Sequence, residues 1–399
     1  MKFIASWLLP LLLAFLPFSK GIMQFEVGIV TLNPYSLGMI LLACLALLFI
    51  NKNVNSKFNF GMTDFFIVAL CLLYLCSTAL SDTPVRSGFV AFHALFIPVL
   101  SYFVIKSFVR SEKDIHRALL FFVLGLLCFG AIQFVHFLKT FSRTIVLDMN
   151  PIDFSTLCIV GILYLLYVRG FKKLSVIVML LSLVVFLFIN LARAYLLALF
   201  ISPLLYLVIR KGKAAFLMTC LLGGTLAFTV FLAANVDYFR VYESQTIRGE
   251  AVHGFDRITK LTYWKQTLYG RGLHFKEGLR EFTKAPIVGQ GMRTGKSKYS
   301  WEHTYFTWHS FNLEWLVFGG IVGYLLYSAV LLSSFRAAGK YARQDKMAAT
   351  ILLAITLILI NSATNGIMHG MMPYAVFILL GFSQSRGREL QMNSPVAQR

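Results

Sequence analysis

The sequence is poor in charged residues, and acidic residues are the scarcest of them. Only 14% of its 399 residues are charged, with 17 Asp and Glu against 37 Lys and Arg. Soluble domains carry about a quarter charged residues, and the mean hydropathy here is +0.73. The chain therefore lies mostly in lipid. The net charge of +20 does not indicate nucleic-acid binding, because basic residues between apolar spans act as topology signals.

Cysteine is also scarce. The six cysteines lie inside apolar runs without metal-ligand spacing, so we interpret them as small core residues rather than disulfide partners. The sequence has no GxSxG, HExxH or Walker loop, and no GxGxxG after a strand. It also lacks a paired-carboxylate site and an Asp-x-Asp metal pattern. We therefore expect no metal and no cofactor, and chemistry that uses His, Arg and Glu side chains.

The main feature of the sequence is its long apolar runs. A helix needs about 20 apolar residues to cross a bilayer, and twelve stretches are candidates, although the sixth, seventh and twelfth are short. They are residues 3–19, 34–50, 63–80, 88–109, 115–138, 154–168, 174–190, 194–209, 214–235, 310–334, 347–363 and 370–384. We interpret the first as an uncleaved helix, because spans continue along the chain. The sequence predicts an all-α polytopic membrane protein with about twelve transmembrane helices.

The distribution of Lys and Arg predicts how these spans are oriented. With the N-terminus inside, twenty basic residues fall in the inner loops and tails, and five fall in the short outer loops. We expect both termini to be cytoplasmic and the protein to lie in a plasma membrane or bacterial inner membrane. The predicted parts are helices 1–9 in residues 1–235, an outer loop at 236–308, helices 10–12 in 309–384 and a tail at 385–399.

The outer loop at 236–308 is the only long one. It holds twelve Lys and Arg against seven Asp and Glu, with many aromatic residues. The segment 273–284, before Pro286, has an amphipathic helical pattern, so we expect short amphipathic helices here. Loops of this length are usually functional or disordered, and the aromatic residues argue against disorder. We expect any chemistry to take place at this loop.

The stretch FTWHSFNLEWLVFGGIVG begins the tenth span with polar residues. His309 at its mouth is either an anchor at the membrane interface beside Trp308, or a base at the lip of an outward-facing cavity. Glu314 lies about a turn deeper. Ionisable groups inside spans are costly, so it should face protein or a water-filled cavity unless it lies at the interface. Gly319 and Gly323 form a GxxxG pair, which indicates close packing with a neighbouring helix.

Three arginines and a glycine pair could bind an anion. Arg193, in NLARAYLLALF, lies in a short outer turn, where the positive-inside rule disfavours it. It either extends to lipid headgroups or points into the bundle to hold a phosphate or diphosphate. Arg257 and Arg271, in the outer loop, could equally be solvated surface charges. Gly289-x-Gly291 is read as a flexible turn and is weak evidence for phosphate binding.

Three stretches together resemble the bacterial O-antigen ligases, within a superfamily that includes the O-antigen polymerases. HSFNLEWLVFGGIVG has the His-Ser pair, nine residues and then Gly320-x-x-Gly323. LARAYLLALF is similar to the family's arginine at the entry to a span. The segment from Arg271 to PIVGQG is similar to its arginine, amphipathic helix and Pro-x-x-Gly-x-Gly. Ala194 and His274 depart from the commoner residues of the family.

The resemblance implies a metal-independent glycosyltransferase of GT-C-like membrane architecture. Its donor would be O-antigen polysaccharide on undecaprenyl diphosphate, and its acceptor the lipid A-core oligosaccharide at the periplasmic face. Arg193 and Arg271 would hold the diphosphate, with Arg257 as a weaker third cation. His309 would deprotonate or orient the acceptor hydroxyl. Glu314, Trp308, Gly289 and Gly291 would support the site.

Other functions remain open at this point. An O-antigen polymerase would use the same donor with a second lipid-linked chain as acceptor. A protein O-oligosaccharyltransferase shares the signature but is usually longer. A transporter or flippase of an anionic lipid-linked glycan is the non-enzymatic alternative, although transporters tend to show inverted repeats and broken helices near the midplane.

Overall fold

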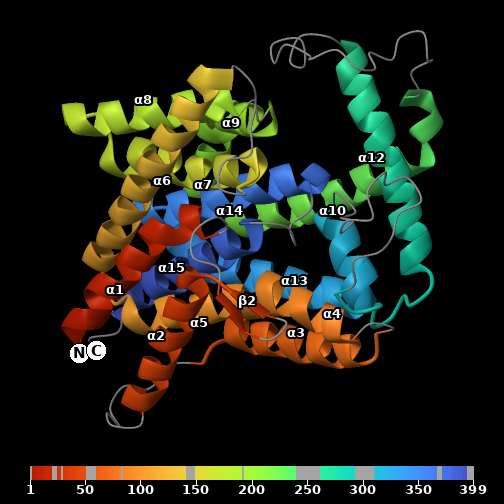
Figure 1. The fold of residues 1–399 in the computed structure, drawn as a ribbon, viewed down its shortest axis with the longest axis horizontal. Helices are drawn as coiled ribbons and strands as arrows, with labels where there is room; N and C mark the ends of the chain where they lie inside the picture. Colours follow the sequence, from red (N-terminus) through yellow and green to blue (C-terminus); the bar gives the residue numbers. More distant parts are fainter. Residues whose placement is uncertain are drawn as a thin grey trace.

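A computed structural model describes most of the chain, namely residues 2–19, 25–27, 30–50, 60–81, 84–140, 149–190, 193–239, 261–292, 310–365 and 371–392. Helices make up almost all of this described part (Figure 1). His309, Trp308 and Arg257 lie outside the described residues. The predicted helical character of the protein is therefore confirmed for the described ranges.

The helices follow the apolar runs of the sequence. In the first half they are α1 Lys2–Phe15, α2 Pro34–Ile50, α3 Met62–Ala79, α4 Pro84–Ala91, α5 Ile97–Phe108, α6 Glu112–Thr140, α7 Pro151–Leu163 and α8 Leu174–Ile189. In the second half they are α9 Arg193–Arg210, α10 Ala214–Ala234, α12 Leu261–Phe282, α13 Phe311–Ala342, α14 Lys346–Asn365 and α15 Met372–Met392. Short 3-10 or π segments are η1 Leu16–Phe18, η2 Phe92–Phe96, η3 Tyr164–Arg169 and η4 Val236–Phe239.

A small hairpin is the exception to the helical pattern. The strands β1 Phe25–Val27 and β2 Val30–Leu32 pair antiparallel, with Glu26 opposite Thr31. It lies between α1 and α2, in a connection that the sequence analysis left without structure. Three residues are too few for a strand to be recognised by its alternating pattern.

All twelve predicted spans coincide with helices, and seven described segments have the length and hydropathy to cross a bilayer. These seven are Met62–Ala79, Ser87–Phe108, Glu112–Lys139, Pro151–Arg169, Ala214–Ala234, Phe311–Ala342 and Lys346–Ala363. Four shorter apolar helices are Trp7–Phe18, Pro34–Ala46, Leu174–Ile189 and Ala194–Arg210. The described chain is thus that of a polytopic membrane protein.

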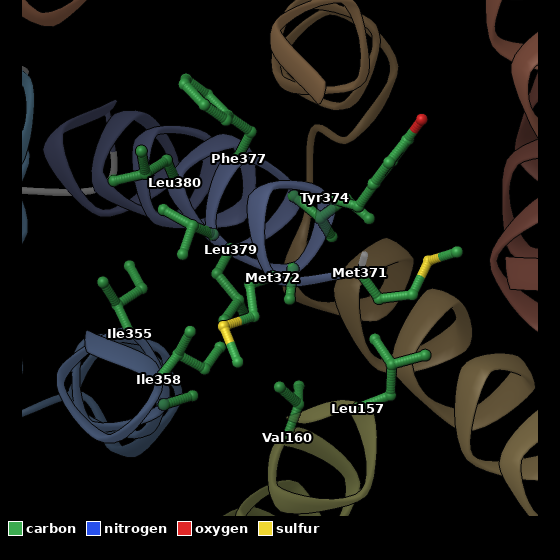
Figure 2. Close-up of a cluster of buried hydrophobic side chains, with 14 of the residues drawn as sticks. Leu157, Val160, Ile355, Ile358, Met371, Met372, Tyr374, Phe377, Leu379 and Leu380 are labelled. Carbon is green, nitrogen blue, oxygen red and sulfur yellow. The ribbon is translucent and has the colours of Figure 1, made fainter. Parts of the chain in front are cut away.

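Close packing between apolar helices forms the interior. Figure 2 shows side chains of α7, α14 and α15 gathered into one cluster, including Val160, Ile358 and Met372, all almost fully buried. The most extensive helix contacts join α15 to α5, α13 to α3 and α1 to α6. Since lipid tails are as apolar as leucine, van der Waals packing rather than exclusion of water holds such helices together.

An ion-pair cluster joins helix ends that are far apart in the sequence. Arg386, near the end of α15, contacts Glu112 at the start of α6 and Asp345 before α14, each at 2.5 Å. Arg210, at the end of α9, donates to the main-chain oxygen of Ala342 at 3.2 Å. The distribution of Lys and Arg predicts that all of these helix ends lie on the same side of the membrane. The contacts between the ends are consistent with that prediction.

A second, buried pair lies close to this cluster. Lys106 of α5 forms an ion pair with Asp64 of α3, and both side chains are almost fully buried. Tyr102 donates to the other oxygen of Asp64 at 2.7 Å, and the main-chain N–H of Gly61 donates to the same carboxylate at 2.6 Å. Lys106 is one of the twenty basic residues that the sequence analysis assigned to the inner side. Its side chain is 2% exposed and neutralises a carboxylate inside the protein.

Candidate functional site

Only part of the predicted site lies in the described residues. Arg271 is on α12, Glu314 is on α13, and Gly289 and Gly291 are in the segment that follows α12. Arg193 is the first residue of α9, and its side chain is not among those described. The roles predicted for these residues therefore remain predictions, and what the structure provides is the arrangement of the elements that bear them.

Helix α12 is longer than the sequence indicated. It runs from Leu261 to Phe282, whereas the amphipathic pattern predicted a helix only from residue 273, after Arg271. Arg271 consequently lies in the middle of a helix and is partly buried. Figure 1 shows α12 at one side of the molecule, crossing the end of α10. Helix α12 belongs to the predicted outer loop, residues 236–308, in which the sequence analysis expected any chemistry to take place.

One face of α10 brings the two main sequence motifs together. The hydroxyls of Thr229 on α10 and Ser310, which follows His309 in the sequence, lie 3.0 Å apart and are buried. Gly272, which follows Arg271, lies so close to α10 that a Cβ atom there would be 3.0 Å from the oxygen of Leu232. Thr229 and Leu232 are three residues apart, about 4.5 Å along the helix axis. The segments bearing the predicted base and the predicted cation thus meet the same stretch of α10.

Glu314 is fully buried, with 0% of its surface exposed. Its charge acts on the hydroxyls of Tyr74 and Tyr327, which belong to a cluster of aromatic side chains. Trp315 stacks on Tyr327 with ring centroids 4.2 Å apart and meets Tyr74 edge-on at 5.4 Å. The glutamate therefore faces protein, as its cost in lipid requires, rather than an exposed membrane interface.

Two further polar residues lie on α12 next to Arg271. Glu277 is 8% exposed, although it belongs to a loop helix. His274 is partly buried and interacts electrostatically with both Glu277 and Arg271. The sequence analysis noted His274 only as a departure from a family pattern. The regular spacing of Arg271, His274 and Glu277 at three-residue intervals could have indicated a shared helix face.

Burial lowers the pKa of His274 below its ordinary value, since desolvation and the Arg271 charge outweigh the attraction of Glu277. The docked helix therefore prefers the neutral imidazole, whereas a detached helix takes up a proton near pH 6.5. We expect α12 to become less stably docked as the pH falls below about 6.5. Hydrogen exchange of α12 amides between pH 5 and 8 measures this. The change should flatten in His274→Gln, and an unaltered pH dependence in that variant would contradict the assignment.

The groups that the candidate site offers are the Arg271 cation, the buried carboxyl group of Glu314, and the hydroxyls of Thr229 and Ser310. In the described ranges, no three His, Cys, Asp or Glu side chains gather as a metal ion would require. Comparison with known proteins adds no assignment: no protein-family model matches the chain, and no curated protein is similar to it in sequence. The site must therefore be interpreted from its own residues.

Proposed function

We propose that the protein is an integral-membrane glycosyltransferase, an O-antigen ligase of the bacterial inner membrane. It transfers O-antigen polysaccharide from undecaprenyl diphosphate to the lipid A-core oligosaccharide at the periplasmic face. In this proposal the chain crosses the membrane twelve times in a GT-C-like architecture, with both termini in the cytoplasm. The single observation that supports it best is the meeting of Ser310 and Gly272, neighbours of His309 and Arg271, on one face of α10.

The proposed reaction needs no metal or cofactor. The oxygen of an acceptor hydroxyl attacks the anomeric carbon of the donor sugar, from the side opposite the diphosphate, and the configuration inverts. The bond from that carbon to the diphosphate oxygen breaks, and the hydroxyl proton passes to His309. Undecaprenyl diphosphate leaves as an anion. Arg193, Arg271 and Arg257 stabilise the negative charge that develops on it.

The remaining predicted residues support this centre. Glu314 and Trp308 flank the segment that contains His309, and Gly289 and Gly291 belong to the segment after α12. The outer loop has a net charge of +5 in the sequence. Such a charge attracts an anionic lipid-linked donor and phosphorylated core sugars.

A transfer assay with purified protein tests the proposal. Undecaprenyl-diphosphate-linked glycan and lipid A-core are incubated with the detergent-solubilised protein in the presence of EDTA. We expect glycan to move onto the core with the wild type and His303→Ala, and transfer to be abolished in His309→Ala. His303 is a matched control because it is a histidine of the outer loop, six residues before His309. Size-exclusion chromatography checks that each variant remains folded.

The alternatives give different outcomes in the same assay. Longer lipid-linked chains without core modification would identify a polymerase, and glycan on an added acceptor protein would identify an O-oligosaccharyltransferase. No product at all, together with movement of the lipid-linked glycan across liposome membranes, would identify a flippase. Each of these results would overturn the ligase proposal.

A further inference from the structure

Helix α13 is broken within its membrane-spanning part. Gly320 has φ 63° and ψ −165°, a backbone region that is essentially restricted to glycine. The break separates Phe311–Gly319 from the longer helical part that begins at Ile321. Main-chain groups on both sides thereby lose their partners within the helix. In a lipid environment each unsatisfied group would cost several kcal/mol.

The segment after α12 supplies the missing partners. Before the break, the oxygens of Val317 and Phe318 accept hydrogen bonds from Gln290 at 2.9 Å and Gly291 at 3.0 Å. After it, the N–H groups of Ile321 and Val322 donate to Pro286 at 2.8 Å and Ile287 at 3.2 Å. Residues 286–291 therefore replace the hydrogen bonds that α13 lacks. We call this segment the clamp.

Glycine is required on both sides of this contact. A Cβ atom on Gly289 would lie 2.3 Å from the carbonyl group of Phe318, and one on Gly320 would lie 2.2 Å from the oxygen of Ile287. Gly289 also has a positive φ of 73°. The sequence analysis interpreted Gly289-x-Gly291 as a flexible turn, but this part of the chain is fixed by main-chain hydrogen bonds.

The clamp also contacts two other helices. The side chain of Gln290 donates to the main-chain oxygen of Glu281, at the end of α12, at 2.6 Å. A Cβ atom on Gly291 would lie 2.7 Å from the oxygen of Ser77, near the end of α3. The clamp thus ties α12, with Arg271, to the first part of α13, with Glu314.

We propose that residues 286–291 act as a positioning element that holds α12 in register with the first part of α13 across the break. Gly289 and Gly320 are positioning residues, because they allow the two backbones to meet but present no group to a substrate. The consequence for glycosyl transfer rests on the proposed function. A displacement of about 1 Å in a reacting group can reduce a rate by about 10²-fold, so the clamp determines whether cation and base act on the same donor.

The test compares Gly320→Ala with Gly323→Ala in the purified full-length protein. Gly323 is a matched control because it lies on the same helix and a Cβ atom there makes only ordinary contacts, 3.4 Å or longer. We expect Gly320→Ala to accelerate hydrogen exchange at the amides of Gln290, Gly291, Ile321 and Val322, and Gly323→Ala to leave exchange unchanged. This measurement requires no enzymatic activity.

Transfer kinetics then test the positioning role. We expect kcat to fall by about 10²-fold in Gly320→Ala, with little change in the KM for the lipid-linked donor, and to stay within about twofold of wild type in Gly323→Ala. If Gly320→Ala does not fold, Gln290→Ala removes the link to Glu281 without backbone strain. It should raise exchange at residues 287–291 and lower kcat by about tenfold, the loss of one hydrogen bond.

The possible results are distinguishable. Unchanged exchange in both Gly320→Ala and Gln290→Ala would overturn the clamp itself. Faster exchange with unchanged kcat would overturn its role in positioning while leaving the ligase proposal intact. A wild-type protein that transfers no glycan would overturn the proposed function, and with it the positioning role, while the exchange measurement would still decide whether the clamp exists.

Discussion

Replacing Arg271 by alanine is expected to lower kcat/KM for glycan transfer by about 10²–10³-fold. This is the usual loss when one group that stabilises developing negative charge is removed. In the proposed reaction that charge develops on the diphosphate, and Arg271 is the candidate cation whose helix meets α10 beside the Ser310 segment. The fall is measured in the transfer assay at saturating and limiting donor concentrations.

Two variants make the Arg271 prediction specific. Arg271→Lys keeps the charge but loses the planar fork that binds two phosphate oxygens, so it should recover only part of the activity. Arg280→Ala removes an exposed arginine from the same helix and should leave transfer near the wild-type rate. Equal losses in Arg271→Ala and Arg280→Ala would indicate a general effect of loop charge and would refute a specific role for Arg271.

Replacing Asp64 by alanine is expected to destabilise the folded protein by about 3–5 kcal/mol. Removing one member of a buried ion pair leaves the other charge uncompensated, and this is the usual cost. Here Lys106 would lose its carboxylate, and the Tyr102 hydroxyl and the Gly61 N–H would lose their acceptor. Unfolding in detergent with increasing denaturant measures the difference.

Asp114→Ala is the matched control for Asp64. Asp114 also lies in the first turn of a helix and accepts main-chain hydrogen bonds, from Arg110 at 3.2 Å and Ser111 at 3.1 Å, but near the surface. Loss of such a cap costs about 1 kcal/mol. The double variant Asp64→Leu with Lys106→Met should recover much of the stability lost in Asp64→Ala. A similar loss in Asp64→Ala and Asp114→Ala would show that burial of the pair adds nothing.

The positions of the helices were predictable because lipid makes a direct demand on sequence. A span must be apolar for a nearly fixed length, so each of the twelve apolar runs falls on a helix, whereas α12, which is not apolar, was recognised only in part. The ends were less accurate where a helix continues beyond the apolar region. For example, α13 continues to Ala342 and α15 to Met392, beyond the predicted ends at residues 334 and 384.

Features that depend on contacts between distant segments were not predictable. The break at Gly320 was not recognised, because the hydrogen bonds missing from the residues around it are supplied by residues about thirty positions earlier. Lys106 looked like a topology signal because its partner, Asp64, is on another helix. The first half of α12 was missed because Gly270 and Gly272 lower helix propensity, and only the approach to α10 reveals why glycine is needed at Gly272.

The candidate site also has features that the sequence predicted and features that depend on how distant segments pack. Sequence motifs identified residues of suitable chemistry, Arg271, Glu314 and His309, from their types and spacing. They did not indicate that the charge of Glu314 acts on Tyr74 and Tyr327, because Tyr74 lies on α3 and Tyr327 lies beyond the break in α13. Nor did they identify Glu277, whose burial follows from how α12 packs.

The break in α13 has a consequence for how the protein is made. A helix with two unsatisfied N–H groups at Ile321 and Val322 is costly to release into lipid by itself. Their partners, Pro286 and Ile287, precede them in the chain and so emerge from the ribosome first. We therefore expect α13 to enter the bilayer already paired with residues 286–291, which are synthesised before it. The order of synthesis thus provides the hydrogen-bond partners before the helix that needs them. A circularly permuted chain that places residues 286–291 after α13 should insert poorly.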